Sequence, residues 1–470
     1  MREFYFQCTH CAASFGLRAW FAAGQCCRAC GVRSAKLWQG TYLEKLYELV
    51  CRQGGESGLW RYFDLLPVTS RTGIISCGES HVPIERWRFL EEIAARKGLQ
   101  LKVYGHRFDL SLATNTFKDI AASLALSVYR EHGIERIALA STGNIGVAYA
   151  RYAGEAGIEL TVFVPDQSEP VNGTFISALG QRIHYAGENY ASVKQAAVTY
   201  AQKRGVTPVA FSHDPLRLEA KKTLPYEWRR RLPEFPTVYI QALSGGTTPL
   251  GVTRGCRDLM GVDMIDDMPR LILVQGSRCK PMADSWRGAK DAGFPPGWEK
   301  TYETLQSPNT EIITLATENP ELYPELAPLV RDSGGTILSF PEDKAAGVAL
   351  LAGLEAGALL GPAACVGLGG FFSALDANQL RNGDVLVILV GEGAARSQRF
   401  LRRVDELAQK LPLNRRKRLN CLNRVLSERL WERQEYPLWI GREPEKGSRV
   451  PTTNIELDCK GNTTRRGKPL

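Results

Sequence analysis

Short apolar runs alternate with helical runs along most of the chain between residues 137 and 390. Strands that alternate with helices predict parallel β-sheets with helices on both faces. In such folds ligands bind at the carboxyl ends of the strands, where loops open into helix N-termini. The sequence therefore predicts an α/β protein whose site lies in strand-to-helix loops. The strand-like runs are Ile137–Ala140, Leu160–Val164, Arg182–Tyr185, Pro208–Phe211, Val238–Leu243, Leu271–Val274 and Val385–Val390, and helical patterns lie at Gly146–Ala156, Val193–Arg204, Leu216–Leu224 and Pro249–Met260.

The length of 470 residues predicts more than one domain, since domains usually run to ~100–200 residues. The net charge of +9 is not spread evenly. Residues 401–470 hold 17 Lys and Arg against 9 Asp and Glu, so the basic character belongs to a C-terminal extension.

Nothing in the sequence indicates a membrane partner. No apolar run approaches the ~20 residues that a membrane span needs. The start, MREFYFQC, lacks the cationic stretch and apolar core of a secretory signal. The expected location is the cytosol.

Lys118 stands where a strand-like segment, LKVYGHRFDL, gives way to an apolar helix. In that helix Ile120, Leu124 and Val128 recur at helical spacing, and Gly133 ends it. Most lysines are solvated surface cations, but a lysine at the edge of so apolar an element loses hydration. This loss lowers the pKa and favours the neutral amine that a Schiff base needs. Lys118 is therefore a candidate Schiff-base lysine.

Two strand-to-helix loops have the composition of anion sites. Ser141, Thr142, Gly143 and Asn144 follow the strand IALA and open a helix, and helix N-termini bind anions well. The same residue types are common as ordinary helix caps, and taken alone the cap is the better interpretation.

The second loop, Ser244-Gly245-Gly246-Thr247-Thr248, follows the strand VYIQAL and precedes Pro249, which suits a first helical position. Two glycines let the backbone close around a phosphate. The loop lacks the lysine of a P-loop and the spacing of a dinucleotide site, so a phosphate carried by another ligand is favoured over a plain turn.

Cys8-x2-Cys11 and Cys27-x2-Cys30 are separated by fifteen residues. Two such pairs suit a tetrahedral zinc ribbon, because each places two thiolates on one tight turn. Cys26 is adjacent to Cys27 and leaves the third ligand open. With only His10 nearby, a structural zinc is favoured over a catalytic one.

The segments between the cysteines and Lys118 are predicted to be irregular. Residues 36–52 look like a linker with a short amphipathic piece. Asp64–Pro67 and Gly78–Ile84 are interpreted as loop and turn, too polar and too rich in glycine and proline for core elements.

Thr116-Phe117-Lys118-Asp119, Ser141-Thr142-Gly143-Asn144 and the glycine-rich loop, in that order, resemble the fold type II pyridoxal-phosphate enzymes. Gly58-Leu59-Trp60-Arg61-Tyr62, the Gly78-Glu79 segment and the N-terminal cysteines resemble the threonine synthase family in particular. The likeness covers roughly residues 1–396.

The resemblance implies a role for each matched residue. Lys118 would bind pyridoxal phosphate as a Schiff base and later move the α-proton, and Asn144 would hydrogen-bond the phenolic oxygen of the cofactor. The cofactor phosphate would be held by Ser244, Gly245, Gly246, Thr247 and Thr248, and the substrate α-carboxylate by the backbone amides of Ser141, Thr142 and Gly143.

Several positions depart from the family pattern. The family's Lys-Asp-Arg is Lys118-Asp119-Ile120 here, its Gly-Glu-Gly-x-Thr-Pro is Gly78–Pro83, and its Glu-Pro is Gly361-Pro362. A threonine usually placed beside the pyridine nitrogen aligns with Val390, which has no polar side chain. Glu392 is either a substitute partner for that nitrogen or a surface acid, and the surface position is favoured.

The resemblance implies an enzyme that eliminates a leaving group from an amino acid, or replaces it. The threonine synthase version, a carbon–oxygen lyase, converts O-phosphohomoserine and water to threonine and phosphate. A cysteate synthase version, a β-replacement transferase, would add sulfite to O-phosphoserine. A tailoring enzyme for a specialised metabolite is a third version.

A non-catalytic alternative is a zinc-ribbon protein that binds nucleic acid. Residues 414–418 (NRRKR) could neutralise phosphates, and Trp431, Tyr436 and Trp439 could stack on bases. Against it stands an apolar stripe typical of a docking helix, so no nucleic-acid partner is expected. The stripe consists of Leu419, Leu422, Val425, Leu426 and Leu430.

The same resemblance implies the domain division. Residues 1–35 would form the zinc ribbon, 53–118 and 213–396 a large cofactor-binding α/β domain, 119–212 a small α/β domain and 397–470 the extension. A homodimer is common among such enzymes.

Overall fold

The computed structural model describes residues 4–23, 25–32, 35–38, 43–79, 81–209, 214–306 and 308–427. The predictions for Ser80, Phe211, Leu430, Trp431, Tyr436 and Trp439 concern residues outside these ranges, and the side chain of Val425 is likewise not described.

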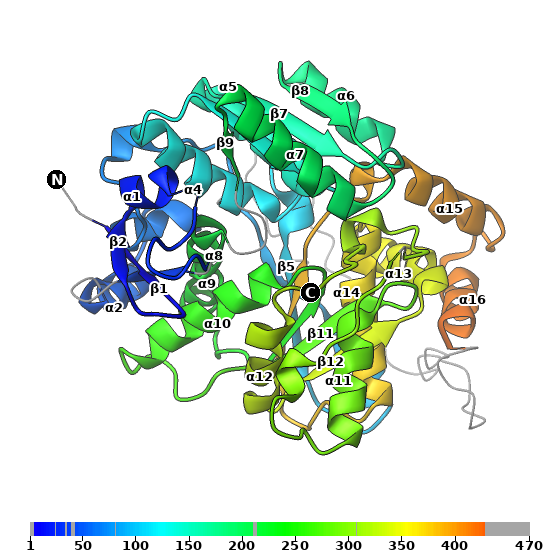
Figure 1. Ribbon diagram of the computed structural model, residues 1–470. Coiled ribbons are helices and arrows are strands. Elements are labelled where there is room, and N and C mark those ends of the chain that lie inside the picture. Colours follow the sequence, from blue (N-terminus) through cyan, green and yellow to red (C-terminus); the bar gives the residue numbers. More distant parts are fainter. Residues whose placement is uncertain are drawn as a thin grey trace, which may run out of the picture. The chain divides into compact units, whose positions relative to one another are not determined.

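The largest sheet has six strands in the order β12-β11-β10-β13-β5-β4. Its neighbouring strands β11 and β12 are labelled in Figure 1. All neighbouring pairs are parallel except β4 and β5, which run antiparallel. β13 is buried along its whole length, as expected for a parallel strand covered on both faces. The strands are β4 (Ile84–Arg86), β5 (Lys102–Arg107), β10 (Val238–Ala242), β11 (Arg270–Gly276), β12 (Thr336–Phe340) and β13 (Val385–Val390).

A second sheet has four parallel strands in the order β8-β7-β6-β9. Its strands are β6 (Arg136–Ala140), β7 (Glu159–Val164), β8 (Arg182–Tyr185) and β9 (Thr207–Pro208), and it contacts α5 (Asn144–Ala156), α6 (Pro170–Ala178) and α7 (Tyr190–Arg204). The prediction of parallel α/β sheets is confirmed. Each sheet falls within one of the two ranges predicted as domains, and the domain boundaries themselves stay a prediction.

Helices that the sequence did not predict cover the six-stranded sheet. α14 packs across β10, β11, β12 and β13 and is buried on nearly all sides. A helix that is apolar all round has no polar face, so its 3.6-residue period is invisible in the sequence. The helices that contact this sheet are α3 (Arg88–Ala95), α11 (Pro281–Asp291), α12 (Tyr323–Asp332) and α14 (Pro362–Asp376), while α13 (Ala345–Ala356) packs on α14 and the predicted helix α10 (Thr247–Met260) packs on α12.

α4 (Lys118–Glu131) packs against α5 and against α8 (Pro215–Lys221), so it joins the two sheets. The single helix predicted at Leu216–Leu224 is two, because the chain begins a new helix, α9 (Thr223–Arg231), after Lys222.

The segments predicted as polar loops belong to the core. Glu79 is fully buried, and its carboxylate accepts hydrogen bonds from Trp60, Ser123 and Tyr152 at 2.8–2.9 Å. A buried charge is tolerated where hydrogen bonds satisfy it, which explains why composition was misleading here. Leu65 and Leu66 are also buried.

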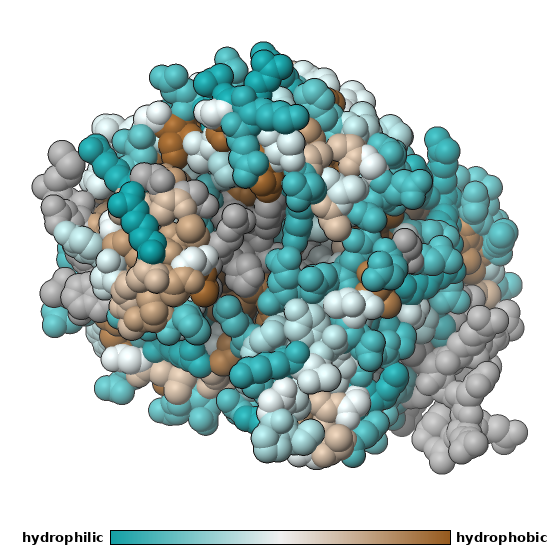
Figure 2. Space-filling model, viewed as in Figure 1, coloured by the Kyte–Doolittle hydropathy of each residue, from teal (hydrophilic) through white to brown (hydrophobic). Residues whose placement is uncertain are grey.

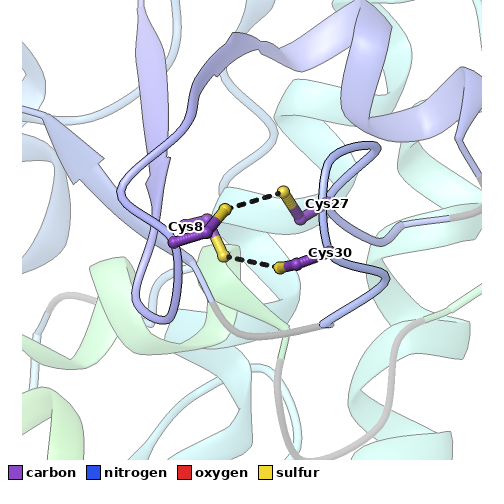
Figure 3. Close-up of side chains that lie close together, drawn as sticks. Cys8, Cys27 and Cys30 are labelled. Atoms are coloured by element: carbon purple, nitrogen blue, oxygen red, sulfur yellow. Dashed lines mark hydrogen bonds between the residues drawn. The ribbon is translucent and has the colours of Figure 1, made fainter.

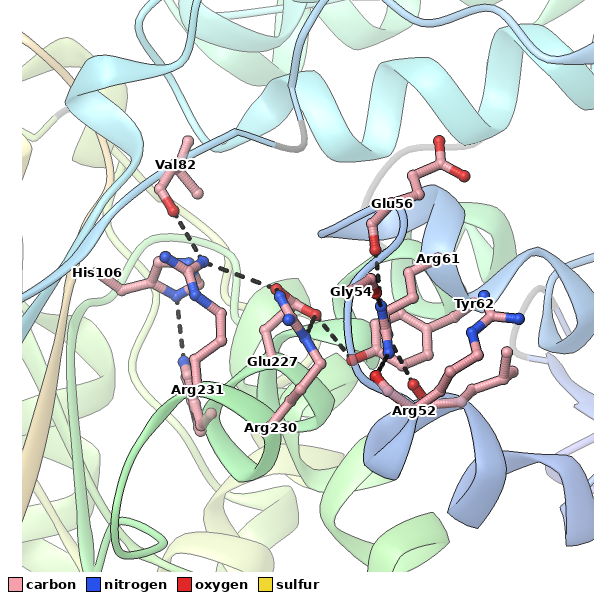
Figure 4. A network of polar contacts seen from close by, with 12 residues as sticks. Arg52, Gly54, Glu56, Arg61, Tyr62, Val82, His106, Glu227, Arg230 and Arg231 are labelled. Atoms are coloured by element: carbon pink, nitrogen blue, oxygen red, sulfur yellow. Dashed lines mark hydrogen bonds and ion pairs between the residues drawn. The ribbon is translucent and has the colours of Figure 1, made fainter.

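Arg61 lies in a buried 3-10 helix, Leu59–Leu65, within this core. Its guanidinium donates to the backbone carbonyls of Leu49, Gly54 and Glu56 at 2.6–2.9 Å, and also to that of Arg52 (Figure 4). The planar guanidinium of Arg61 thus holds the backbone segment at the end of α2 (Glu44–Cys51) and after it in place.

The N-terminal segment forms a three-stranded antiparallel sheet in the order β2-β1-β3. It consists of β1 (Tyr5–Cys8), β2 (Ser14–Gly16) and β3 (Ala35–Trp38), with α1 (Leu17–Ala22) between β2 and β3. The linker predicted from residue 36 is therefore wrong for residues 36–38, which pair with β1.

The C-terminal extension continues as α15 (Gln398–Gln409) and α16 (Arg415–Ser427), which pack on α13. Leu422 and Leu426 are buried, as predicted for a docking helix, and the buried Lys344 donates to the carbonyl of Leu426 at 2.6 Å. Arg415 and Lys417 are exposed. The expectation of no nucleic-acid partner stays a prediction.

Hydrophilic side chains cover most of the face shown in Figure 2, and hydrophobic ones form small separate groups. In the part of the chain that the structure describes, no helix is long and apolar enough to cross a membrane.

Candidate active site

A cavity of about 350 Å³ opens where strands of both parallel sheets end. Lys118, Asn144, Gly246 and Glu392 line it, and they come from the loops after β5, β6, β10 and β13. Its volume suits a small ligand. The cavity thus lies at the carboxyl ends of the strands, where the site was predicted.

Lys118 is held in place by its neighbours in the chain. Asp119 is fully buried and accepts hydrogen bonds from the Ser111 hydroxyl at 2.5 Å and the Thr114 backbone N–H at 3.0 Å. Burial raises the pKa of Asp119 to about 6 against these bonds. The N–H of Phe117 donates to Gly391 O at 3.1 Å, which ties the lysine loop to the end of β13.

The amine of Lys118 has an altered pKa. Burial and then the positive charge of Arg217 lower the pKa of Lys118 to about 8, against the opposing effect of Glu392. The ammonium lies 4.1 Å from the ring centre of Phe117. Near neutral pH a sizeable fraction of this lysine is therefore the nucleophilic amine.

The glycine-rich loop opens α10, and its five predicted residues, Ser244–Thr248, all line the cavity. Gly246 has a φ of +87°, and a Cβ there would lie 2.9 Å from Leu326 Cδ2, so only glycine fits. The Ser244 hydroxyl lies 2.9 Å from the Thr317 hydroxyl, which braces the loop. A helix N-terminus facing a cavity is a suitable anion site.

The Ser141–Asn144 loop contributes only part of its predicted residues. Thr142 and Asn144 line the cavity, whereas Ser141 is buried behind it and Gly143 does not reach it. The Ser141 hydroxyl accepts from the N–H groups of Gly143 at 3.0 Å and Gly146 at 2.8 Å. Ser141 is therefore a helix cap, and the N–H of Gly143 is already satisfied.

Glu392 is not a surface acid, so the prediction favoured from the sequence is wrong. It is 2% exposed, accepts from the Asn144 amide and accepts from the Ala363 N–H at 2.8 Å. A Cβ at Gly361 would lie 2.7 Å from Glu392 Cγ, so the side chain of Glu392 occupies the space beside Gly361. Val390, at the end of β13, is fully buried.

Two cavity residues, Arg217 and Lys221, were missed by the sequence analysis. They stand four residues apart on α8, a spacing that places both on one helix face. The helix itself was predicted, so a search for charges repeated on its buried face would have found them.

The four predicted zinc ligands converge, with the sulfur atoms of Cys8, Cys11, Cys27 and Cys30 within 4.8 Å of one another. Figure 3 shows Cys8 on one turn, with Cys27 and Cys30 facing it from a second turn. Cys26 points away, toward the carbonyl of Ala23. The cluster therefore consists of the four predicted cysteines and does not include Cys26.

The model of the family described as "Pyridoxal-phosphate dependent enzyme" matches residues 78–391. The threonine synthase of Methanocaldococcus jannaschii is 23% identical over 377 residues, which is 79% of this chain and 88% of that protein. The cysteate synthase of Methanocorpusculum labreanum is 22% identical over 346 residues, 72% of this chain and 83% of that protein.

Solved structures share the fold at low identity. An L-serine ammonia-lyase from Rhizomucor miehei has a TM-score of 0.57 at 19% identity, over 72% of this chain and 99% of that one. Threonine deaminase isoform 2 from Solanum lycopersicum has a TM-score of 0.56 at 16% identity, over 77% of this chain and 94% of that one.

The cavity fits a small aldehyde that bears a phosphate. Lys118 offers an amine of lowered pKa, the N-terminus of α10 offers N–H groups to an anion, and Asn144 offers a polar amide. These groups are the donor set that pyridoxal phosphate requires, so the residues present agree with the family match.

The lowered pKa of Lys118 predicts unusual reactivity of its amine in the cofactor-free protein. A lysine reacts with an acylating reagent only when neutral, so its modification should rise with pH to half-maximum near pH 8. Brief acetylation from pH 6 to 11 with peptide mass analysis measures this. In Arg217→Met the midpoint should move upward, because a positive charge is lost. A wild-type midpoint near the ordinary 10.5 would contradict the account.

Proposed function

Because the chain belongs to the family of pyridoxal-phosphate dependent enzymes, we propose that it removes a phosphate group from a phosphorylated amino acid. The leading substrate is O-phosphohomoserine, converted with water to threonine and phosphate. The threonine synthase and cysteate synthase relatives support elimination or replacement on an amino acid as the reaction class.

The cofactor is held by residues of the cavity. Lys118 is its covalent attachment point, Ser244–Thr248 hold its phosphate, and Asn144 donates to its phenolic oxygen. When bound, pyridoxal phosphate supplies an electron sink for the bond electrons released at the substrate α-carbon. Thr142 faces the cavity and is the loop residue best placed to meet the substrate carboxylate.

Lys118 is also the proton carrier. Its nitrogen would take the proton from the substrate α-carbon and return a proton later in the reaction. A pKa of about 8 suits both steps, because neutral and protonated forms are then both populated near neutral pH.

The observation that carries the choice of a phosphorylated substrate is the pair of cations on α8. Arg217 is 3.6 Å from Asp214 and donates to the Tyr149 hydroxyl at 3.2 Å. Lys221 is 2% exposed, and among the described residues its ammonium has no hydrogen bond or ion pair.

A buried ammonium without a hydrogen bond or ion pair is unfavourable, and the nearby Asp214 only partly offsets this. Burial, and then the charges of Lys118 and Arg217, lower the pKa of Lys221 well below its ordinary range. A dianionic group in the cavity would restore the charge of Lys221 and satisfy it. The cofactor phosphate is assigned to the Ser244–Thr248 loop. The dianionic group that meets Lys221 therefore belongs to the substrate.

The alternative substrate is O-phosphoserine with sulfite as nucleophile, as the name of the cysteate synthase relative indicates for that protein. The same cations would serve it, since both the leaving group and the nucleophile are anions. A tailoring enzyme for an unusual phosphorylated amino acid would use the cavity in the same way. A cytosolic location and a homodimer stay predictions.

Phosphate release tests the proposal. The purified protein with pyridoxal phosphate should release phosphate from O-phosphohomoserine, or from O-phosphoserine when sulfite is added, and Lys118→Ala should release none. Lys221→Met should raise KM about 10-fold to 100-fold, the expected loss of a charged hydrogen bond.

The matched control is Lys290→Met, the same change at an exposed position of α11, which should leave KM unchanged. Release of phosphate from neither substrate, by a protein that has bound the cofactor, would contradict the choice of substrate class.

The N-terminal cysteines hold a structural zinc ion in this proposal. Tetrahedral zinc with bonds of about 2.3 Å places its sulfurs about 3.8 Å apart. Cys8 and Cys30, and likewise Cys11 and Cys27, have sulfurs 3.6 Å apart.

Elemental analysis should therefore find about one zinc per chain. Cys27→Ser should lose the metal and lower the thermal midpoint, because the turns that join β1 to its neighbours lose their crosslink. Cys51→Ser, at an exposed cysteine outside the cluster, should do neither. Zinc-free protein from a zinc-supplied culture would contradict the assignment.

A further inference from the structure

Asn144, Glu392 and Arg396 form a buried polar cluster at the cavity wall. They are 6%, 2% and 5% exposed. Arg396 Nε donates to Asn144 Oδ1 at 3.3 Å, and Asn144 Nδ2 donates to a carboxylate oxygen of Glu392. Of the three, Asn144 and Glu392 line the cavity.

The two charged partners fix which way the amide points. A guanidinium can only donate hydrogen bonds, and a carboxylate can only accept them. If the amide of Asn144 were turned over, its oxygen would face Glu392 and its nitrogen would face Arg396, and both contacts would become repulsive. The Glu392 carboxylate and the Arg396 guanidinium therefore determine which end of this amide is the oxygen and which is the nitrogen.

Glu392 is itself held at both oxygens. Its second oxygen accepts from the N–H of Ala363 at the start of α14, and its backbone carbonyl accepts from the N–H of Gly361 at 3.0 Å. Arg396 is anchored in turn, because it also donates to the side-chain oxygen of Asn172 on α6. The cluster thus joins the end of β13, the start of α14 and two helices of the four-stranded sheet.

An amide nitrogen has two hydrogens, and Glu392 accepts one of them. The other hydrogen can be offered to a ligand in the cavity, while Arg396 donates to the amide oxygen. Asn144 can therefore serve the cavity as a donor to an acceptor atom.

We propose that Glu392 and Arg396 are positioning residues that lock Asn144 as a hydrogen-bond donor to an anionic oxygen of the bound ligand. Resting on the proposed function, that oxygen is the phenolic oxygen of pyridoxal phosphate in its deprotonated form. Glu392 acts through Asn144 in this scheme and needs no contact with the cofactor.

The main alternative is that Glu392 acts directly as a negative charge. The charged groups facing Glu392 are Arg396 and Lys118. Glu392 raises the pKa of Lys118, so a direct effect and a positioning effect both reach the nitrogen of that lysine. The two effects shift the pKa at that nitrogen in opposite directions, so the direction of the shift in a variant distinguishes them.

The experiment compares Glu392→Gln with Asn144→Ala in protein loaded with pyridoxal phosphate. In Glu392→Gln an NH2 group replaces one of the two carboxylate oxygens. This new donor must face either the N–H of Ala363 or the NH2 group of Asn144, both of which are donors themselves. The absorbance of the bound cofactor is titrated with pH, and its midpoint reports the proton shared between the phenolic oxygen and the Lys118 nitrogen.

A phenolic oxygen that loses its donor becomes more basic and retains that proton to higher pH. If Glu392 works by positioning, Glu392→Gln should move the midpoint upward by about one unit, as Asn144→Ala does, and the double variant should move it no further. A downward shift, no shift, or additive shifts in the double variant would overturn the proposal.

Arg396→Met provides a second variant and should also shift the midpoint upward. Glu355→Gln, the same chemical change on α13 away from the cavity, is the matched control and should match the wild type. Thermal midpoints of all variants show whether they fold. A wild-type protein without a cofactor band would be a failure of the proposed function, which is a distinct result.

Discussion

The partial dehydration of one amine is the constraint on which the rest of the site depends. Lys118 begins α4, and the hydrogen bonds to the buried Asp119 fix the loop before it. The tie between Phe117 and Gly391 then brings that loop to the end of β13. Parallel strands all end on the same edge of their sheet, so the glycine-rich loop that opens α10 lines the same cavity as the lysine.

Charge around the cavity is arranged in two groups. Arg217 and Lys221 on α8 supply positive charge that the described residues only partly balance through Asp214. Glu392 and Arg396 instead balance one another across the amide of Asn144. In the proposed function the first group would bind the anionic substrate and the second would orient a neutral side chain. The cavity would then hold two anionic groups at different places.

The sequence predicted those parts whose signal is local. Strands such as β6 and β7, the lysine at the start of α4 and the two cysteine pairs each have a short pattern that tertiary context does not alter. The sequence analysis missed α14 because this helix is apolar all round. It placed Glu79 and Glu392 outside the core because the partners that satisfy a buried acid come from distant segments. The role of Ser141 stays a prediction, since a helix cap and an anion ligand use the same residue types.

The most direct test of the central claim is to identify the lysine that binds the cofactor. The protein is mixed with pyridoxal phosphate, reduced with borohydride to make the link permanent, and digested for peptide mass analysis. The account predicts the cofactor on Lys118 alone, with Lys221 unmodified although it lines the same cavity. Attachment to Lys221, or reduction without any labelled peptide, would contradict the account.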